Sequence, residues 1–311
     1  MGEKKKLIVL TGPTAIGKTA LSIKLAKKIG GEIISADSMQ VYRGMDIGSA
    51  KITPEEMCGV RHHLIDILDP TEEFNITMFQ TLAKQAMEEI YVGGNVPILA
   101  GGTGFYIQSV LYDIDFASNE EDNGSLRREL EEKAAVHGAA YMHDWLKKLD
   151  PESAEAIPAG NVRRVIRAIE YYELTGTRIS DHNKEQRKKP SPYDFRYFVL
   201  TMDRERLYKR IEKRIDLMLE WGLVDEVRRL KEAGCQKGMT SMQGLGYKEI
   251  LSYLDGECSL EDAVTLLKRD TRHFAKRQLT WFRRERDVIW IDKEAFGDDE
   301  DKLCDHIISL I

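Results

Sequence analysis

The segment GPTAIGKT at residues 12–19 matches the phosphate-binding pattern G-x-x-x-x-G-K-[ST]. In such a P-loop the backbone amides point inward, and the N-terminus of the following helix adds partial positive charge. Lys18 adds a full charge, and Thr19 can place its hydroxyl on a magnesium ion. The pattern predicts that the loop binds a diphosphate or a triphosphate through Gly12, Pro13, Thr14, Ala15, Ile16, Gly17, Lys18 and Thr19.

The neighbouring residues provide the context that this motif requires. An apolar run at residues 7–10 is typical of a buried strand, and apolar residues at helical spacing follow the loop as far as Gly30 and Gly31. A glycine-rich turn that binds nothing is the alternative. It is disfavoured because strand, loop, lysine and helix all agree.

Two further segments supply polar groups at the same edge of the predicted sheet. The second predicted strand, residues 31–37, ends at Asp37, and the third, residues 96–100, leads into GGTG with Thr103. Ligands of parallel α/β sheets bind beyond the carboxyl ends of the strands, so both side chains are expected near the phosphate site. Asp37 could act through magnesium or as a general base, or it could only cap a helix or turn. The GGTG segment could equally be a tight turn.

Several other polar residues have more than one interpretation. Most P-loop nucleotidases place an acidic residue after an apolar strand, but glycines follow the third strand here, and Asp66 is only a weak substitute. This weakens the interpretation as an ATPase. Because His62 and His63 would point in different directions, we expect a turn or capping role rather than a metal site. Arg210 and Arg214 lie four residues apart on a predicted helix, where they could clamp phosphate oxygens or form an exposed charged face.

The order of the elements predicts an α/β fold, namely a P-loop doubly wound parallel sheet with a helical insertion domain. Strand and helix alternate over the first 115 residues, with an amphipathic helix at residues 77–91 between the second and third strands. Strands resume at residues 195–200 and 288–291. We therefore assign residues 1–115 and 190–311 to the catalytic core. The insertion, residues 116–189, shows no convincing strand, and its helical patterns lie at residues 125–136, 140–149 and 161–174.

Composition and charge limit the function classes further. The 311 residues carry a net charge of −6, yet residues 161–189 and 268–286 are rich in Lys and Arg, which favours local contact with a phosphate backbone. Solvated helix faces are the alternative for such basic runs. We expect no membrane segment and no signal peptide. The four cysteines form no C-x-x-C, so zinc and disulfides are disfavoured and a cytoplasmic location is expected.

Taken in order, the motifs resemble those of the tRNA dimethylallyltransferases, also called tRNA isopentenyltransferases. GPTAIGKT is followed by ADSMQVYRGMDIGSAK, RHHLID and GGTGFY, and then by NVRRVIRAIE, GLGYKEI and FAKRQLTWFRR. The resemblance covers nearly the whole chain and is to the bacterial type, because the Cys/His zinc-finger extension of some eukaryotic relatives is absent. Lys248 stands where the family often has an arginine.

The resemblance implies transfer of a dimethylallyl group from dimethylallyl diphosphate to the exocyclic amine of the adenine 3′ of a tRNA anticodon. The P-loop would then hold a diphosphate leaving group together with Mg²⁺. No water needs activation, so the missing acidic strand end is no obstacle. The insertion would close over the anticodon arm. We expect a monomer.

The resemblance also implies roles for individual residues. Asp37 would take a proton from the adenine amine, and Thr103 would contact the substrates at the reacting centre. Arg214 would join the P-loop at the diphosphate, and Thr19 would meet the metal. The residues expected at the tRNA are Asp37, Ser38, Met39, Gln40, Thr103, Arg127, Asn161, Val162, Arg163, Arg164, Val165, Gln243, Gly244, Leu245, Gly246, Tyr247, Lys248 and Arg277.

Three alternatives belong to other function classes. An ATP-dependent small-molecule kinase would leave the basic segments unused. A non-catalytic RNA-binding protein would not need the intact Gly17, Lys18 and Thr19. A prenyltransferase acting on free adenine nucleotide would not need the insertion or the second basic segment.

Overall fold

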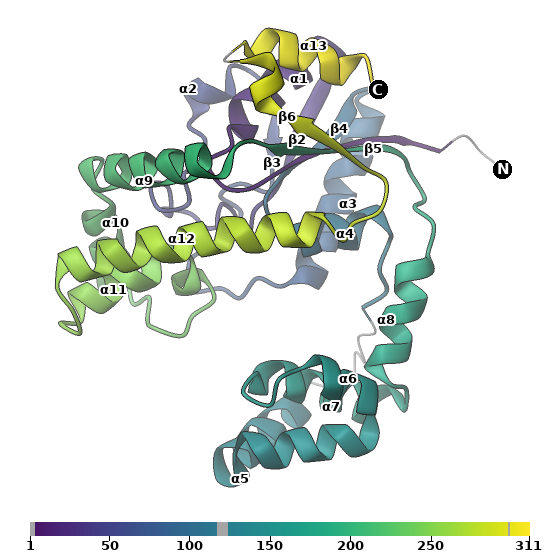
Figure 1. Cartoon of the computed structure of the whole chain (residues 1–311), viewed down its shortest axis with the longest axis vertical. Coiled ribbons are helices and arrows are strands. Elements are labelled where there is room, and N and C mark those ends of the chain that lie inside the picture. The colour runs from purple at the N-terminus through teal and green to yellow at the C-terminus, as the bar shows by residue number, and fades with distance from the viewer. Residues whose placement is uncertain (1–3, 117–123, 298) are drawn as a thin grey trace. The chain divides into compact units, whose positions relative to one another are not determined.

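The core of the computed structural model is a six-stranded parallel sheet with the strand order β3-β2-β4-β1-β5-β6. The structure describes residues 4–116, 124–297 and 299–311. The chain begins in the middle of the sheet and winds to both edges, which confirms the predicted doubly wound α/β fold (Figure 1). The strands are β1 (Lys6–Thr11), β2 (Gly31–Ala36), β3 (His62–His63), β4 (Val96–Gly101), β5 (Asp194–Thr201) and β6 (Val288–Asp292).

The central strands have nearly continuous apolar sequences because helices cover both faces of a parallel sheet. In β1, Val9 lies between Leu99 of β4 and Tyr197 of β5, and all three are fully buried. The strands all run in one direction, so their carboxyl ends meet at one edge. Gly12, Asp37 and the segment after Gly101 therefore leave the sheet side by side.

Helices from the same compact unit as the sheet pack around it. The long helix that ends at Phe282 begins directly after Ser259, whose hydroxyl accepts the amide of Asp262 at 3.1 Å and so caps the first turn. The helices are α1 (Lys18–Ile29), α2 (Pro54–Met57), α3 (Ile76–Val92), α4 (Gly104–Leu111), α9 (Arg204–Glu220), α10 (Leu223–Glu232), α11 (Tyr247–Leu254), α12 (Leu260–Phe282) and α13 (Glu300–Ile308), with the 3-10 turns η1 (Ser241–Gln243) and η2 (Lys293–Phe296).

Residues Tyr112–Ser191 form a second compact unit, whereas the sequence pattern predicts an insertion at residues 116–189. Its helices are α5 (Ser125–Leu149), α6 (Pro151–Ala156), α7 (Val162–Thr175) and α8 (Ile179–Lys188). Gly138, with φ of 83°, interrupts α5, which explains why the pattern predicts two helices there. Buried apolar side chains such as Leu130, Leu146 and Ile169 form a core that is separate from the sheet. The polar helix α8 was not predicted.

Asp150 ties the short helices of this unit together. Its fully buried carboxylate accepts the amides and hydroxyls of Ser153 and Ser180, at distances from 2.7 to 3.1 Å. Burial by itself would raise the pKa of Asp150, but these hydrogen bonds outweigh it and lower the pKa. The unit therefore holds its fold with a satisfied polar group as well as an apolar core.

None of the helices in residues 4–116, 124–297 and 299–311 combines the length and the apolar character of a membrane span.

Candidate active site

The P-loop connects β1 to α1 and depends on backbone conformations that glycine tolerates best. Gly12 has φ of 149°, and a Cβ atom there would lie 2.8 Å from the carbonyl oxygen of Leu200. Gly17, with φ of 97°, stands directly before the first turn of α1. The loop therefore makes the sharp turn from strand to helix that the motif predicts.

Lys18 lies under the loop rather than in solvent. Its Nζ donates to the carbonyl oxygens of Gly12 at 3.0 Å and Pro13 at 2.9 Å. Burial lowers the pKa of Lys18 to about 7, and the positive charge of Arg214 acts in the same direction, while Asp37 opposes both. A bound anion would stabilise the protonated form of Lys18 strongly, because its negative charge offsets the cost of burying the ammonium group.

Arg214 reaches the same loop from α9. Its Nη1 lies 3.4 Å from the hydroxyl of Thr14. Burial lowers the pKa of Arg214, and the Asp37 carboxylate partly restores it. Since a guanidinium stays protonated in proteins, the site keeps a fixed positive charge beside Lys18. The structure thus brings Arg214, the P-loop and Asp37 together.

Asp37 and Thr103 follow neighbouring strands. Ala36 pairs with Gly101 across β2 and β4, and the Thr103 amide donates to the Ala36 carbonyl at 3.2 Å. A Cβ atom at Gly101 would lie 2.2 Å from that same carbonyl, so only glycine permits this approach. Asp37 Oδ1 accepts the Met39 amide at 2.9 Å, which fixes the carboxylate in a tight turn.

Gln278 is a site residue whose role no sequence motif indicates. From α12 its Oε1 accepts the Thr14 amide at 2.9 Å, and its Nε2 donates to the Gly102 carbonyl at 2.9 Å. The side chain is only 6% exposed. One carboxamide therefore joins the P-loop to the GGTG loop. A polar residue at a buried-face position of α12, between Ala275 and Phe282, is the signal that could have revealed it.

A buried carboxylate binds the backbone of residues 46–48, in the loop that follows Asp37. Glu226 of α10, 1% exposed, accepts the amides of Asp46, Ile47 and Gly48 at 2.8 to 3.0 Å. The Tyr247 hydroxyl donates to the same carboxylate at 2.8 Å. These contacts fix the backbone of residues 46–48, and no sequence motif points to Glu226.

Two of the segments expected at the tRNA lie against each other. A Cβ atom at Gly244 would lie 2.7 Å from Met39 Sδ, and one at Gly48 would lie 2.6 Å from the Tyr247 ring. The Ser35 hydroxyl donates a hydrogen bond to Oε1 of Gln40 at 2.9 Å. Because Tyr247 is fully buried, its side chain packs under this surface, which is at odds with direct contact to RNA.

The other residues expected at the tRNA fall into two groups. Gln243 and Arg277 are exposed, and Lys248 lies 3.2 Å from Glu249 and 3.7 Å from Asp270. Gly244 and Gly246 are buried and Leu245 is half-buried.

The second unit contributes the remaining predicted residues. Arg163 and Arg164 are exposed, while the side chain of Asn161 caps α7. Arg127 forms an ion pair with the buried Glu170 at 3.2 Å. Val165 is fully buried in the core of the unit, so its side chain cannot reach RNA and has a packing role instead. Val162 packs partly against the same core.

The described residues contain no group of three or more His, Cys, Asp or Glu that could hold a metal ion. Thr19, exposed at the start of α1, could offer one hydroxyl oxygen to a metal ion. That donor set fits Mg²⁺, which commonly binds one or two protein oxygens together with substrate phosphates. Asp66 is engaged elsewhere, in an ion pair with Lys51 at 2.5 Å.

The two histidines form the edge strand β3, which corrects the expectation of a turn or capping role. His63 Nε2 lies 2.7 Å from Glu32, and Asn95 donates to the same carboxylate at 2.7 Å. His62 Nδ1 contacts the Val60 carbonyl at 2.9 Å. A two-residue strand is too short for a periodic sequence pattern to reveal.

Comparisons with known proteins agree with this geometry. The family described as IPP transferase matches residues 40–285. A "tRNA dimethylallyltransferase" of Lachnoclostridium phytofermentans is 62% identical over 97% of this chain and 96% of its own length. One of the same name from Acetivibrio thermocellus is 54% identical, covering 94% of both chains.

Solved structures give the same result. The full-length tRNA isopentenylpyrophosphate transferase of Bacillus halodurans has a TM-score of 0.73 and 46% identity, over 98% of this chain and 96% of that one. A eukaryotic dimethylallyltransferase acting on tRNA has a TM-score of 0.84 and 32% identity, over 98% of this chain and 78% of that one. With the P-loop, Asp37 and Thr103 at one edge of the sheet, this chain belongs to the IPP transferase family, with the tRNA dimethylallyltransferases as its relatives.

Proposed function

We propose that this chain transfers a dimethylallyl group from dimethylallyl diphosphate to the exocyclic amine of the adenine just 3′ of a tRNA anticodon, and releases diphosphate. The observation that carries the proposal is the convergence of a P-loop, two buried or half-buried cations and one carboxylate at the carboxyl edge of the sheet. Membership in the IPP transferase family supports the same reaction.

The cations serve the leaving group. When the allylic carbon–oxygen bond breaks, both of its electrons remain on the diphosphate. Lys18 and Arg214 both contact the P-loop. Together with the loop amides they would stabilise that charge where it develops. A kinase would need an acidic residue near the phosphates and a site for the phosphoryl acceptor. The candidate for the acidic residue is Asp66, which is paired with Lys51 instead.

Asp37 serves the nucleophile. A neutral exocyclic amine is a poor nucleophile, and its nitrogen forms the new bond to the allylic carbon as the old bond breaks. The proton that this nitrogen loses goes to the Asp37 carboxylate. The Met39 amide donates to Oδ1 of Asp37, which fixes the carboxylate in the turn after β2, and the Thr103 amide donates to the carbonyl of the preceding residue, Ala36. We assign Thr103 to contact with the substrates.

Magnesium would be held by the Thr19 hydroxyl and by oxygens of the diphosphate. Bound there, the ion would neutralise charge on the leaving group.

The exposed basic residues would hold the RNA backbone. Arg163, Arg164, Arg277 and Gln243 are exposed, and Gly244, the residue after Gln243, packs against Met39. Ser38, Met39 and Gln40 would lie against the adenine once it is flipped out of the anticodon loop. The exposed arginines would contribute phosphate contacts, which position the RNA but carry little sequence information.

The acceptor class can be tested directly. The protein is incubated with Mg²⁺, radiolabelled dimethylallyl diphosphate and tRNA from cells that lack this modification, with AMP in a parallel reaction. We expect label in the tRNA and none in AMP. Label in AMP alone would show a free-nucleotide prenyltransferase. No label, together with phosphate transfer from ATP to a small molecule, would show a kinase.

A further inference from the structure

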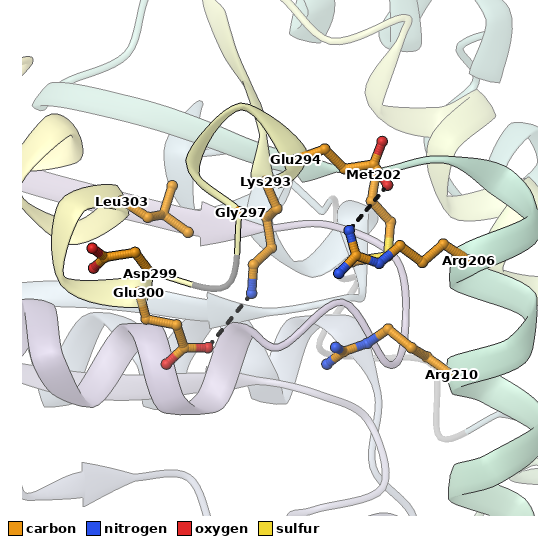
Figure 2. A pocket seen from close by; sticks show the side chains of 9 residues that line it. All are labelled: Met202, Arg206, Arg210, Lys293, Glu294, Gly297, Asp299, Glu300 and Leu303. Carbon is orange, nitrogen blue, oxygen red and sulfur yellow. Dashed lines mark hydrogen bonds and ion pairs between the residues drawn. The ribbon is translucent and has the colours of Figure 1, made fainter.

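Two cations hold the side of the P-loop that faces away from the expected diphosphate. Arg210 Nε of α9 donates to the Ala15 carbonyl at 2.8 Å, and Lys293 Nζ of η2 donates to the Ile16 carbonyl at 3.2 Å. Figure 2 shows the two side chains reaching the same region from different elements (Figure 2). We propose that Lys293 and Arg210 are positioning residues for diphosphate binding, and we call the pair the outer clamp.

Peptide geometry connects the outer clamp to the ligand. In a planar trans peptide the carbonyl oxygen and the amide hydrogen point in opposite directions. The Ile16 carbonyl shares its peptide with the Gly17 amide, so holding the oxygen outward directs the Gly17 amide inward. The Ala15 carbonyl shares its peptide with Ile16, whose amide closes the turn onto Pro13 at 3.4 Å. Lys293 therefore acts on an amide that faces the diphosphate, and Arg210 acts on the turn before it.

The fit around Gly17 shows how closely the clamp approaches the loop. A Cβ atom at Gly17 would lie 2.9 Å from Lys293 Nζ and 3.6 Å from Arg210 Nη2. The Lys293 side chain is only 11% exposed, and its Nζ lies 3.6 Å from Glu300 of α13. A cation in this position also polarises the peptide, which makes the Gly17 amide a stronger donor.

The cavity next to Lys293 and Arg210 is too small to explain these cations as a separate anion-binding site. It measures about 60 Å³, which is room for a few water molecules. Its lining also balances cations with carboxylates, because Arg206 lies 3.4 Å from Glu294 and Lys293 is paired with Glu300 (Figure 2). The cations therefore act on the loop carbonyls rather than on an anion in the cavity.

Docking of the C-terminal helix does not explain the contact either. Other ion pairs attach α13 to α1, namely Lys24 with Asp301 at 2.9 Å and Lys28 with Asp305. These pairs can hold the helix without Lys293. The contact from Lys293 to Ile16 thus makes the C-terminal segment part of the diphosphate site's support. Only the identity of the ligand rests on the proposed function.

The test measures binding of inorganic diphosphate in the presence of Mg²⁺ by calorimetry, without tRNA. We expect Lys293→Met to weaken binding about tenfold or more, because a charge-assisted hydrogen bond to the loop is lost. Lys293→Arg should restore most of the affinity. In turnover, Lys293→Met should raise KM for dimethylallyl diphosphate and leave KM for tRNA unchanged. Arg210→Met should weaken diphosphate binding less, because Arg210 is exposed.

Two controls separate positioning from packing. Lys302→Met removes an exposed ion pair with Asp299 in the same segment, and Lys24→Met loosens α13 without touching the P-loop. Both should bind diphosphate like the wild type. Wild-type affinity in Lys293→Met, or an equal loss in Lys24→Met, would overturn the proposal.

If Lys293→Met does not fold, Arg210→Met decides the question, and unchanged affinity there overturns the clamp. Diphosphate binding requires no prenyl transfer. If Lys293→Met binds diphosphate more weakly than the wild type, and the wild type does not label tRNA, the outer clamp is supported and only the proposed function is contradicted.

Discussion

The diphosphate side of the site and the surfaces expected to meet RNA are built differently. Around the P-loop, Lys18 and Gln278 each make two hydrogen bonds to loop backbone groups and are partly or wholly buried. Arg163, Arg164 and Arg277 are exposed instead. The first arrangement suits charge that develops at one fixed place during a reaction. The second suits a polyanion whose phosphates can be met in several ways. Substitutions in the two regions should therefore differ in size and in kind.

The largest effect is expected at Asp37. Asp37→Asn keeps an oxygen that can accept the Met39 amide, so the turn should survive while the general base is lost. We expect kcat to fall by about 10²–10⁴-fold with tRNA affinity unchanged. Single-turnover transfer and a tRNA binding assay measure the two effects separately. Unchanged turnover would remove Asp37 from the mechanism.

The next effect concerns pH and Lys18. Its pKa of about 7 means that the free protein loses this cation as the pH rises above 7. Affinity for dimethylallyl diphosphate should therefore fall above pH 7, approaching about tenfold per pH unit. Binding should also take up a proton, which calorimetry in buffers of different ionisation enthalpy detects. Lys18→Met should bind weakly and lose this pH dependence. The same slope in Lys18→Met would assign the titration to another group.

Gln278 should have an intermediate effect. Gln278→Met keeps the size of the side chain but leaves the Thr14 amide and the Gly102 carbonyl without this partner. Each unsatisfied buried group costs about 1–3 kcal/mol. We therefore expect the free energy of unfolding to fall by about 2 kcal/mol and kcat/KM to fall about tenfold. Thr280→Ala, on the exposed face of the same helix, is the control. If Gln278→Met matches the wild type in kcat/KM, the bridge between the loops has no role in turnover.

The smallest effect is expected on the RNA-facing side. Arg163→Ala together with Arg164→Ala should weaken tRNA binding and reduce its salt slope by about 1 for each phosphate that an arginine no longer neutralises. Saturating kcat should not change. Lys147→Ala with Lys148→Ala removes the same charge from another exposed surface of this unit. An equal loss of affinity in that control would mean that the unit attracts RNA only through its overall charge.

The sequence was sufficient for the features that depend on local patterns. The P-loop, the strand ends at Asp37 and Thr103 and five of the six strands follow from motif spacing and apolar runs, which act over a few residues. The edge strand β3 is too short to show a period, and α8 is too polar to show an apolar face.

The contacts that support the site could not be predicted in this way. Gln278, Glu226 and Lys293 reach P-loop or loop backbone groups that lie 176 to 277 residues away in the sequence. Their side chains carry no motif that specifies a partner, because only the fold brings them to it. Val165 shows the opposite case, since it lies within a motif assigned to RNA but packs in the core.

The most direct test of the central claim is to find where the label ends up in the tRNA. After reaction with labelled dimethylallyl diphosphate, the tRNA is digested to nucleosides and fragments that define the modified position. We predict that all label lies on the exocyclic nitrogen of the adenine 3′ of the anticodon in wild-type reactions, and that Asp37→Asn gives almost none. Label at other positions, or equal labelling by Asp37→Asn, would contradict a site in which the P-loop holds the leaving group and Asp37 serves the incoming amine.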